Sequence, residues 1–230
     1  MNLSSNATRG SQVEFTRNFS HCPQMQDYIT SALATLLVIA DPIFLSALFL
    51  GLTNDLNREQ RREVAMRGSF IAFCILLGAG LGGAKLLSLL GISLSAFRIA
   101  GGLLLLSAAA EMVFDRRGQR QHDTVQKAIS IDHVKNIAAF PLAIPLMAGP
   151  GAITAMILLA GRAEGDYVRL GALYAVTAVV MLACCLCFLA AERISKTMGI
   201  TGRAVISRLL GIILAALAVQ FIIDGVKTLI

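Results

Sequence analysis

Two prolines within long apolar stretches have neighbours that could bind a small polar solute. Pro42 follows Asp41, and Pro150 lies between Gly149 and Gly151. Proline lacks a backbone N–H and its ring clashes with the carbonyl four residues earlier, so we expect each proline to interrupt a helix. The half-helix after a break begins at a partly positive end that suits a carboxylate, and freed carbonyls suit an ammonium group or a cation. A zwitterionic amino acid carries both charges.

Polar side chains near these prolines extend the predicted solute site. A charge such as Asp41 within a membrane costs about 3 kcal/mol and usually marks a functional position. Ser46 and Thr154 each follow a proline by four residues, although such hydroxyls often bond to their own helix. Free N–H groups are expected around residues 152–154. The predicted substrate-binding residues are Asp41, Pro42, Ser46, Gly149, Pro150, Gly151 and Thr154, and the coupling-ion candidates are Asp41 and Glu111.

A simpler interpretation remains open for these residues. The prolines would then only bend packed helices, and Glu111 would mark a helix end near the lipid headgroups. If Pro150 makes the break, replacing it with Ala should restore a continuous helix and weaken solute binding more than folding. Two interruptions at one depth nevertheless favour a binding centre, because transporters bind solutes at discontinuous helices.

Long apolar stretches must position these residues. The chain has 230 residues, of which 56% are hydrophobic and 15% charged, whereas soluble domains are about one quarter charged. About 20 apolar residues span a bilayer core. The sequence therefore predicts an all-helical membrane protein with six spans, at approximately 28–52, 69–90, 94–114, 136–160, 167–191 and 206–229.

The positive charges predict the orientation of the spans. The net charge is +6, and thirteen of the 20 Lys and Arg residues follow spans one, three and five. The positive-inside rule places that side in the cytoplasm and both termini outside it. The basic balance therefore indicates topology and not a nucleic-acid partner. Residues 1–27 are predicted to be a disordered extracytoplasmic tail, and Met25 is an alternative start just before the first span.

The two halves of the chain repeat one another. Each half has three predicted spans, so the second copy enters the membrane from the opposite side, as in the inverted repeats of secondary transporters. Repeat one covers about 28–114, a cytoplasmic linker about 115–135, and repeat two about 136–230. Three features recur in order, at offsets of 108 to 110 positions: Pro42 with Pro150, Gly91 with Gly199, and Arg98 with Arg208.

Several kinds of chemistry have no support in the sequence. The five cysteines form no Cys-x-x-Cys pair, and the three histidines lie outside the spans, so we expect no metal site. No Gly-x4-Gly-Lys-Ser/Thr, His-Glu-x-x-His or Gly-x-Ser-x-Gly motif occurs, which argues against ATP-driven pumping and hydrolytic catalysis. We expect neither an enzyme nor a cofactor.

Several short motifs occur in a specific order along the chain, among them Asp41–Ile43, Pro141–Pro145 and Ala148–Ile153. With these motifs, the sequence from about residue 28 to 230 resembles the MarC family of integral membrane proteins. The resemblance implies six spans, a bacterial inner-membrane location and a transport role, since some relatives are regarded as transporters of small neutral amino acids. It also implies a difference at Asp41, where the family usually has Asn; a carboxylate can bind a proton and an amide cannot. The residues that carry it are Asp41–Ile43, Ala47–Leu52, Gly91–Ser93, Arg98–Leu103, Pro141–Pro145, Ala148–Ile153, Ser207–Gly211 and Val219–Gly225.

The sequence thus favours a secondary transporter. The expected solute is small and polar, such as a neutral amino acid, and the expected driving force is a proton or sodium gradient. The alternatives are an efflux protein for metabolites or drugs, and a membrane scaffold or sensor that transports nothing. The direction of transport, the substrate and the oligomeric state leave no signal in the sequence.

Overall fold

The computed structural model describes residues 25–54, 56–114, 137–163 and 166–228. This part of the chain is helical and contains no strand, which confirms the predicted all-helical class. The predicted linker and all but the end of the predicted tail lie outside it. The helices are 25–40, α2 (Pro42–Leu52), α3 (Arg58–Leu89), α4 (Leu94–Val113), η1 (Ala138–Met147), α7 (Pro150–Arg162), α8 (Tyr167–Leu189) and α9 (Ala191–Lys227).

The helices have the length and composition of membrane spans. Five of them, including 25–52 taken together, are long and apolar enough to cross a bilayer, and the bent pair η1 and α7 makes a sixth. Large apolar side chains are exposed on their outer surfaces, for example Leu81 at 59% and Leu182 at 60%. An exposed leucine surface of this kind is stable in lipid and unfavourable in water.

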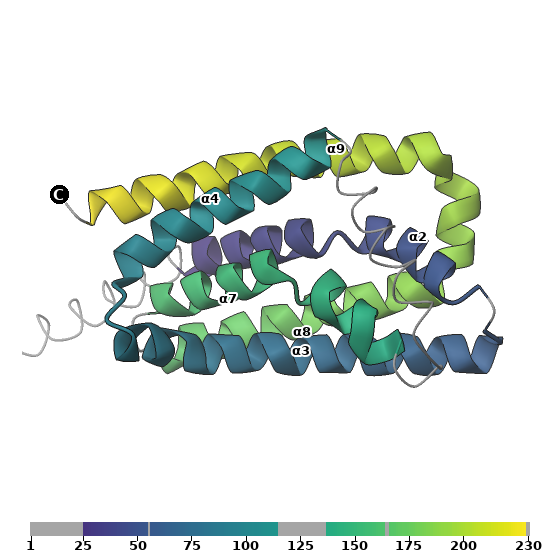
Figure 1. Cartoon of the computed structure of the whole chain (residues 1–230), viewed down its shortest axis with the longest axis horizontal. Coiled ribbons are helices and arrows are strands. Elements are labelled where there is room, and N and C mark those ends of the chain that lie inside the picture. Colours follow the sequence, from purple (N-terminus) through teal and green to yellow (C-terminus); the bar gives the residue numbers. More distant parts are fainter. Residues whose placement is uncertain (1–24, 55, 115–136, 164–165, 229–230) are drawn as a thin grey trace, which may run out of the picture.

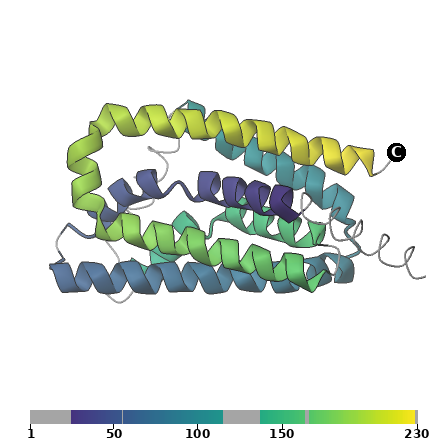
Figure 2. The same ribbon diagram turned by 180° about the vertical axis from the view of Figure 1, so that it is seen from behind.

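The helices form an elongated bundle with the interrupted helices in the middle (Figure 1). The pair α4 and α9 packs along one side, and α3 lies with α8 along the opposite side. Helix 25–40, α2, η1 and α7 run between these two pairs, and the view from behind shows the same order (Figure 2). Helix 25–40 and α2 together are the most buried of the candidate spans, whereas η1 packs mainly on α3 and has exposed side chains at Phe140 and Ile144.

Two helices extend beyond the spans predicted from hydropathy. The second span was predicted from residue 69, but α3 begins at Arg58, where the Asn57 side chain accepts from the Gln60 N–H at 2.9 Å and the Gln60 side chain accepts from the Asn57 N–H at 3.1 Å. The sixth span was predicted from residue 206, and α9 begins earlier, at Ala191. However, its backbone is non-helical at Gly199 (φ 60°, ψ −175°), so a short helix before Gly199 meets the helix of the span at a kink. Apolar length defines what crosses the bilayer, whereas caps and propensity define where a helix begins.

Candidate functional site

The first interruption is centred on Asp41. Helix 25–40 ends there, and Asp41 adopts a left-handed backbone conformation with φ 40° and ψ 69° before α2 begins at Pro42. Its Oδ1 accepts a hydrogen bond from the Phe44 N–H at 3.2 Å and so caps α2. Asp41 is only 1% exposed. A charged side chain is thus held inside the bundle as the cap of a half-helix.

A second residue, which the sequence analysis did not select, also holds this carboxylate. The Ser207 hydroxyl, on α9, donates to Asp41 Oδ2 at 3.2 Å, and Ser207 itself is buried. Ser207 immediately precedes Arg208, the residue that the repeat pairs with Arg98. The internal repeat was the only sequence signal that could have pointed to Ser207. However, the position that matches Ser207 in the first repeat is Phe97, just before Arg98, and phenylalanine has no hydroxyl group. Nothing in the pattern itself therefore pointed to a hydroxyl.

The second interruption separates η1 from α7. The two segments meet at an angle of 60°. Within η1, Phe140 and Ile144 have extended backbone conformations, and the peptide bonds that follow them, to Pro141 and Pro145, are cis. Gly149 is the N-cap of α7 and supplies no side-chain hydrogen bond. The first turn of α7 therefore begins without the kind of cap that Asp41 gives to α2.

The uncapped start of α7 corrects the predicted set of free donors. The Ile153 N–H donates to the Gly149 carbonyl at 3.0 Å, so it is not free as predicted. In the described part of the chain, the backbone N–H groups of α7 without a partner in the first turn are those of Gly151 and Ala152, since Pro150 has none. The positive end of the helix lies one residue earlier than the sequence indicated.

Pro150 has a different role from the one predicted. It occupies the first position of α7, where the missing N–H would be unbonded in any case, and it is exposed. The bend precedes it, in the backbone of η1 and Ala148. At Gly149, an added Cβ would lie 2.6 Å from the Pro145 carbonyl oxygen. A residue with a side chain would therefore not fit at Gly149 without a shift of the backbone.

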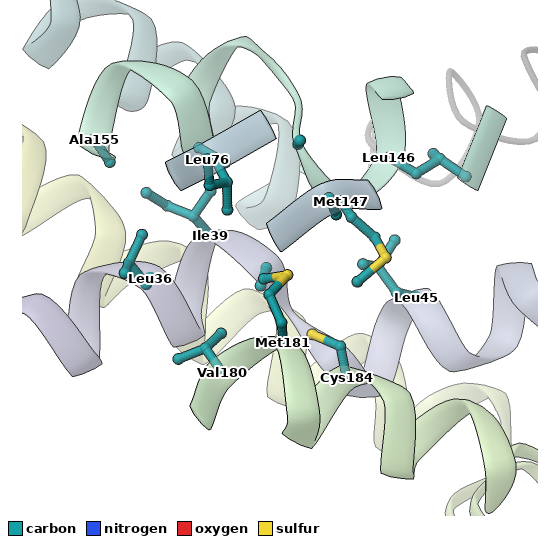
Figure 3. Packing of buried hydrophobic residues seen from close by; sticks show 14 of the residues in the cluster. Leu36, Ile39, Leu45, Leu76, Leu146, Met147, Ala155, Val180, Met181 and Cys184 are labelled. Carbon is teal, nitrogen blue, oxygen red and sulfur yellow. The ribbon is translucent and has the colours of Figure 1, made fainter. Parts of the chain in front are cut away.

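The two interruptions lie side by side in the core. A Cβ added at Gly151 would sit 4.0 Å from Ile39 Cγ2, two residues before Asp41, and 3.6 Å from Leu105 Cδ2. Figure 3 shows Met147 directed towards Leu45, with Met181 in the same space. The region is closely packed, and methionine is a side chain that adapts readily to a change in shape.

The remaining predicted residues fall into two groups. Ser46 is buried, but its hydroxyl donates to the Ile43 carbonyl of its own helix at 2.6 Å. Thr154 is also buried, and its methyl group packs directly on Gly101 of α4. Glu111 is half-buried near the end of α4, about 9 Å along the helix from Leu105. Ser46 therefore bonds within its own helix, Thr154 packs against α4, and Glu111 lies at a distance from the two interruptions.

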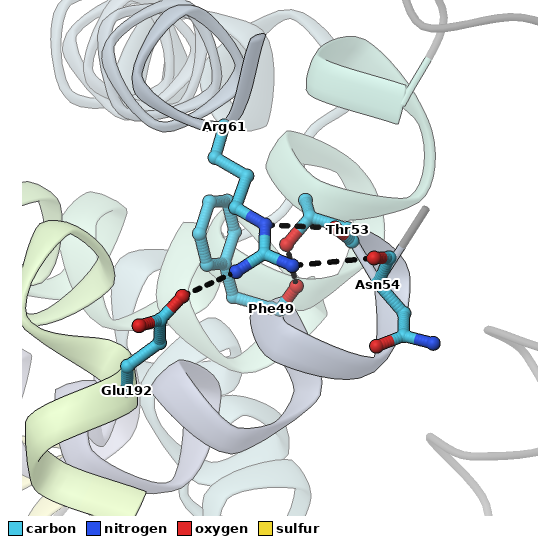
Figure 4. Close-up of polar contacts among 5 residues, drawn as sticks. All are labelled: Phe49, Thr53, Asn54, Arg61 and Glu192. Atoms are coloured by element: carbon cyan, nitrogen blue, oxygen red, sulfur yellow. Dashed lines mark hydrogen bonds and ion pairs between the residues drawn. The ribbon is translucent and has the colours of Figure 1, made fainter. Parts of the chain in front are cut away.

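Ion pairs fasten the far ends of both interrupted helices to α9. At the end of α2, Arg61 of α3 donates to the Thr53 carbonyl at 2.9 Å and to the Asn54 carbonyl at 3.2 Å, and its Nη1 lies 2.7 Å from Glu192 Oε1 (Figure 4). At the end of α7, Arg162 pairs with Asp224. The Arg162–Asp224 pair thus joins α7 directly to α9. The Arg61–Glu192 pair joins α3 to α9, and the end of α2 is connected to it through the hydrogen bonds that Arg61 donates.

The Arg162 side chain also packs against an aromatic ring. Its guanidinium lies 4.6 Å from the centre of the Phe221 ring, one turn before Asp224 on α9. The guanidinium is thus held by a charge and a ring together. Among the residues that the structure describes, no group of three or more His, Cys, Asp or Glu side chains could hold a metal ion.

A polytopic helical bundle with a lipid-compatible surface and interrupted central helices defines an integral membrane protein. The family model described as MarC family integral membrane protein matches residues 26–230. The chain therefore belongs to the MarC family.

Individual relatives match over nearly their whole length. A UPF0056 membrane protein of Archaeoglobus fulgidus is 35% identical over 86% of this chain and 92% of its own. The UPF0056 inner membrane protein MarC of Salmonella typhimurium is 33% identical over 86% of this chain and 93% of its own. No solved structure matches the chain significantly.

Proposed function

We propose that this protein is a secondary transporter of a small zwitterionic solute, such as a neutral amino acid, and that it works by alternating access. The observation that supports this most directly is the adjacency of two interrupted helices in the enclosed middle of the bundle. Broken helices deep in a membrane are tolerated where they face protein or a cavity. Transporters use such breaks to bind their solutes.

The two interruptions offer complementary electrostatics for a zwitterion. The uncapped N–H groups of Gly151 and Ala152 suit the carboxylate of the solute. Asp41 suits its ammonium group or a coupling cation. Its carboxyl group is two residues from Ile39, whose Cγ2 would lie 4.0 Å from a Cβ added at Gly151. Bringing the ammonium group there requires the Asp41–Ser207 hydrogen bond to loosen.

The geometry also supports the inverted repeat. Gly91 and Gly199, matched by the sequence, both have positive φ, 69° and 60°. The α4–α9 contacts are reciprocal: an added Cβ at Gly102 would meet the Ala218 carbonyl at 2.8 Å, and one at Gly211 would meet the Ala109 carbonyl at 3.2 Å. Two-fold related repeats would produce paired contacts of this kind.

The ion pairs at the two ends suggest how access could alternate. Arg61–Glu192 closes the end where α2 terminates, and Arg162–Asp224 closes the end where α7 terminates. We propose that one pair separates while the other stays closed, so that solute leaves towards one side only. The packed centre then corresponds to a closed state, and Met147 and Met181 yield when the solute enters.

The proposed driving force is a proton or sodium gradient acting through Asp41. No enzymatic activity is part of the proposal. The end of the bundle with Arg61 faces the cytoplasm in this proposal, and both termini face the opposite side, because Arg58, Arg62 and Arg193 also lie at that end.

Flux measurements on the purified protein in liposomes test the proposal. We expect labelled alanine, glycine or serine to accumulate under an imposed pH or sodium gradient and not without one. Gly151→Ala should lower this flux at least tenfold, because the methyl group covers the free N–H groups. The matched control is Gly171→Ala, where an added Cβ meets nothing within 4 Å and flux should not change.

Two outcomes would contradict the proposal. Absence of flux for every solute in a folded preparation would favour a scaffold or sensor. Flux of larger apolar compounds alone would favour an efflux protein for metabolites or drugs.

A further inference from the structure

A cavity of about 500 Å³ lies at one end of the bundle, away from the interruptions at Asp41 and Gly149. It is bounded by the end of α2, the start of α3, the end of α8 and the start of α9. This basic cavity is lined by Phe49, Leu50, Arg58, Arg61, Arg62, Leu186, Phe188, Leu189, Ala190, Glu192 and Arg193.

The lining of the basic cavity carries a net charge of +3. Its one acidic side chain, Glu192, is already paired with Arg61. Arg58, Arg62 and Arg193 are exposed, and none of them forms an ion pair with another described residue. Three guanidinium groups are therefore directed to one cavity without a described anion to balance them.

The other wall of the basic cavity is apolar. Phe49 and Phe188 stack with their ring centres 4.8 Å apart and are buried. Leu186 and Leu189 on α8 are 56% and 50% exposed, and they belong to a helix that the bilayer would surround. The apolar wall therefore opens onto the lipid-facing surface of α8, beside the arginines.

We propose that the basic cavity binds an anionic phospholipid, with its headgroup phosphate among Arg58, Arg62 and Arg193 and its acyl chains along Leu186 and Leu189. Guanidinium groups bind phosphate through paired N–H donors. Basic pockets between membrane helices at the positively charged side are suited to such headgroups. The exposed leucines distinguish a lipid from a free anion, because only a lipid has chains to cover them. The basic cavity includes Arg61 and Glu192 of the proposed gate, but it lies apart from the two interruptions where the solute is proposed to bind.

The main test compares lipid binding to two doubly substituted proteins of equal charge. Arg62→Gln with Arg193→Gln removes two cavity arginines. The matched control is Arg67→Gln with Lys196→Gln, on the same helices but outside the cavity lining. Native mass spectrometry with phosphatidylglycerol measures the dissociation constant of the bound lipid. We expect it to rise at least tenfold in the cavity variant and less than threefold in the control.

Two further arms identify the ligand, using the unsubstituted protein. Phosphatidylglycerol should raise the unfolding temperature more than phosphatidylcholine with the same chains. Glycerol phosphate at equal concentration should not bind measurably. Equal weakening in both double variants, equal stabilisation by the two lipids, or equal binding of glycerol phosphate would each overturn the proposal. The thermal measurement decides the matter even if the cavity variant does not fold.

Discussion

The two interrupted helices break in different ways. At Asp41 the chain folds a carboxylate into the core, caps the next half-helix with it and ties it to Ser207. At Gly149 the chain bends by 60° and leaves the next half-helix uncapped. The first interruption therefore carries its own carboxyl group, whereas the second presents an unfilled positive end. This asymmetry is what a zwitterionic solute would exploit.

The largest effect is expected from removing the charge or the cap at Asp41. Asp41→Ala loses the cap, the Ser207 acceptor and the tolerance of Asp for positive φ, which together should cost about 3 kcal/mol of unfolding free energy. Asp41→Asn keeps an acceptor oxygen and tolerates the left-handed conformation. It should therefore fold, measured by thermal unfolding in detergent, while flux loses its dependence on the imposed gradient.

The Asp41→Asn variant can also contradict the proposed difference between the two interruptions. If its gradient-driven flux equals that of the unsubstituted protein, the charge at the first interruption has no part in coupling. Ser46→Ala is the control, since its hydroxyl bonds only to its own helix in the described structure, and its flux and stability should stay unchanged.

The next largest effect separates the two glycines at the second interruption. Gly149→Ala places a Cβ 2.6 Å from the Pro145 carbonyl oxygen and should cost about 2 kcal/mol by overpacking. Gly151→Ala meets its nearest neighbour at 3.6 Å and should leave stability within 0.5 kcal/mol. Thermal unfolding of both variants measures the difference. Equal stability of the two would mean that the bend at Gly149 is not tightly fixed.

A smaller effect is expected at Ser207. Ser207→Ala removes one hydrogen bond to the buried Asp41 and should lower the unfolding free energy by about 1 kcal/mol. In a double-substitution cycle with Asp41→Ala, the two changes should not be additive, because both remove the hydrogen bond between these side chains. Simple additivity would show that Ser207 does not hold this carboxylate.

The smallest effect is expected at Pro150, where the structure revises the prediction from the sequence. Pro150→Ala changes an exposed first residue of α7 and should alter stability by less than about 1 kcal/mol. It should not restore a continuous helix, because the bend lies in η1 and at Ala148. Cysteine-pair distance measurements between η1 and α7 would test this. A straightened pair in the variant would return the break to the proline.

The sequence predicted the structure most accurately where a local rule applied. Hydropathy located the spans to within a few residues where helix and apolar run coincide, as at α4 and α8. It placed the start of α3 too late, because polar residues such as Arg58 and Glu63 continue a helix that Asn57 caps. Proline rules indicated interruptions near residues 42 and 150, but they could not place the bend within η1 or the free donors at Gly151 and Ala152.

By itself, the sequence determined that the chain is a helical membrane protein, that polar and helix-breaking residues stand inside two of its spans, and that it resembles the MarC family. Only the tertiary structure decided which distant groups meet. Asp41 and Ser207 are 166 positions apart, and the basic cavity collects residues from four helices. Hydrophobic periodicity and composition indicate the environment of each helix. Contacts between helices depend on how the helix faces pack together, and no local sequence pattern encodes that packing.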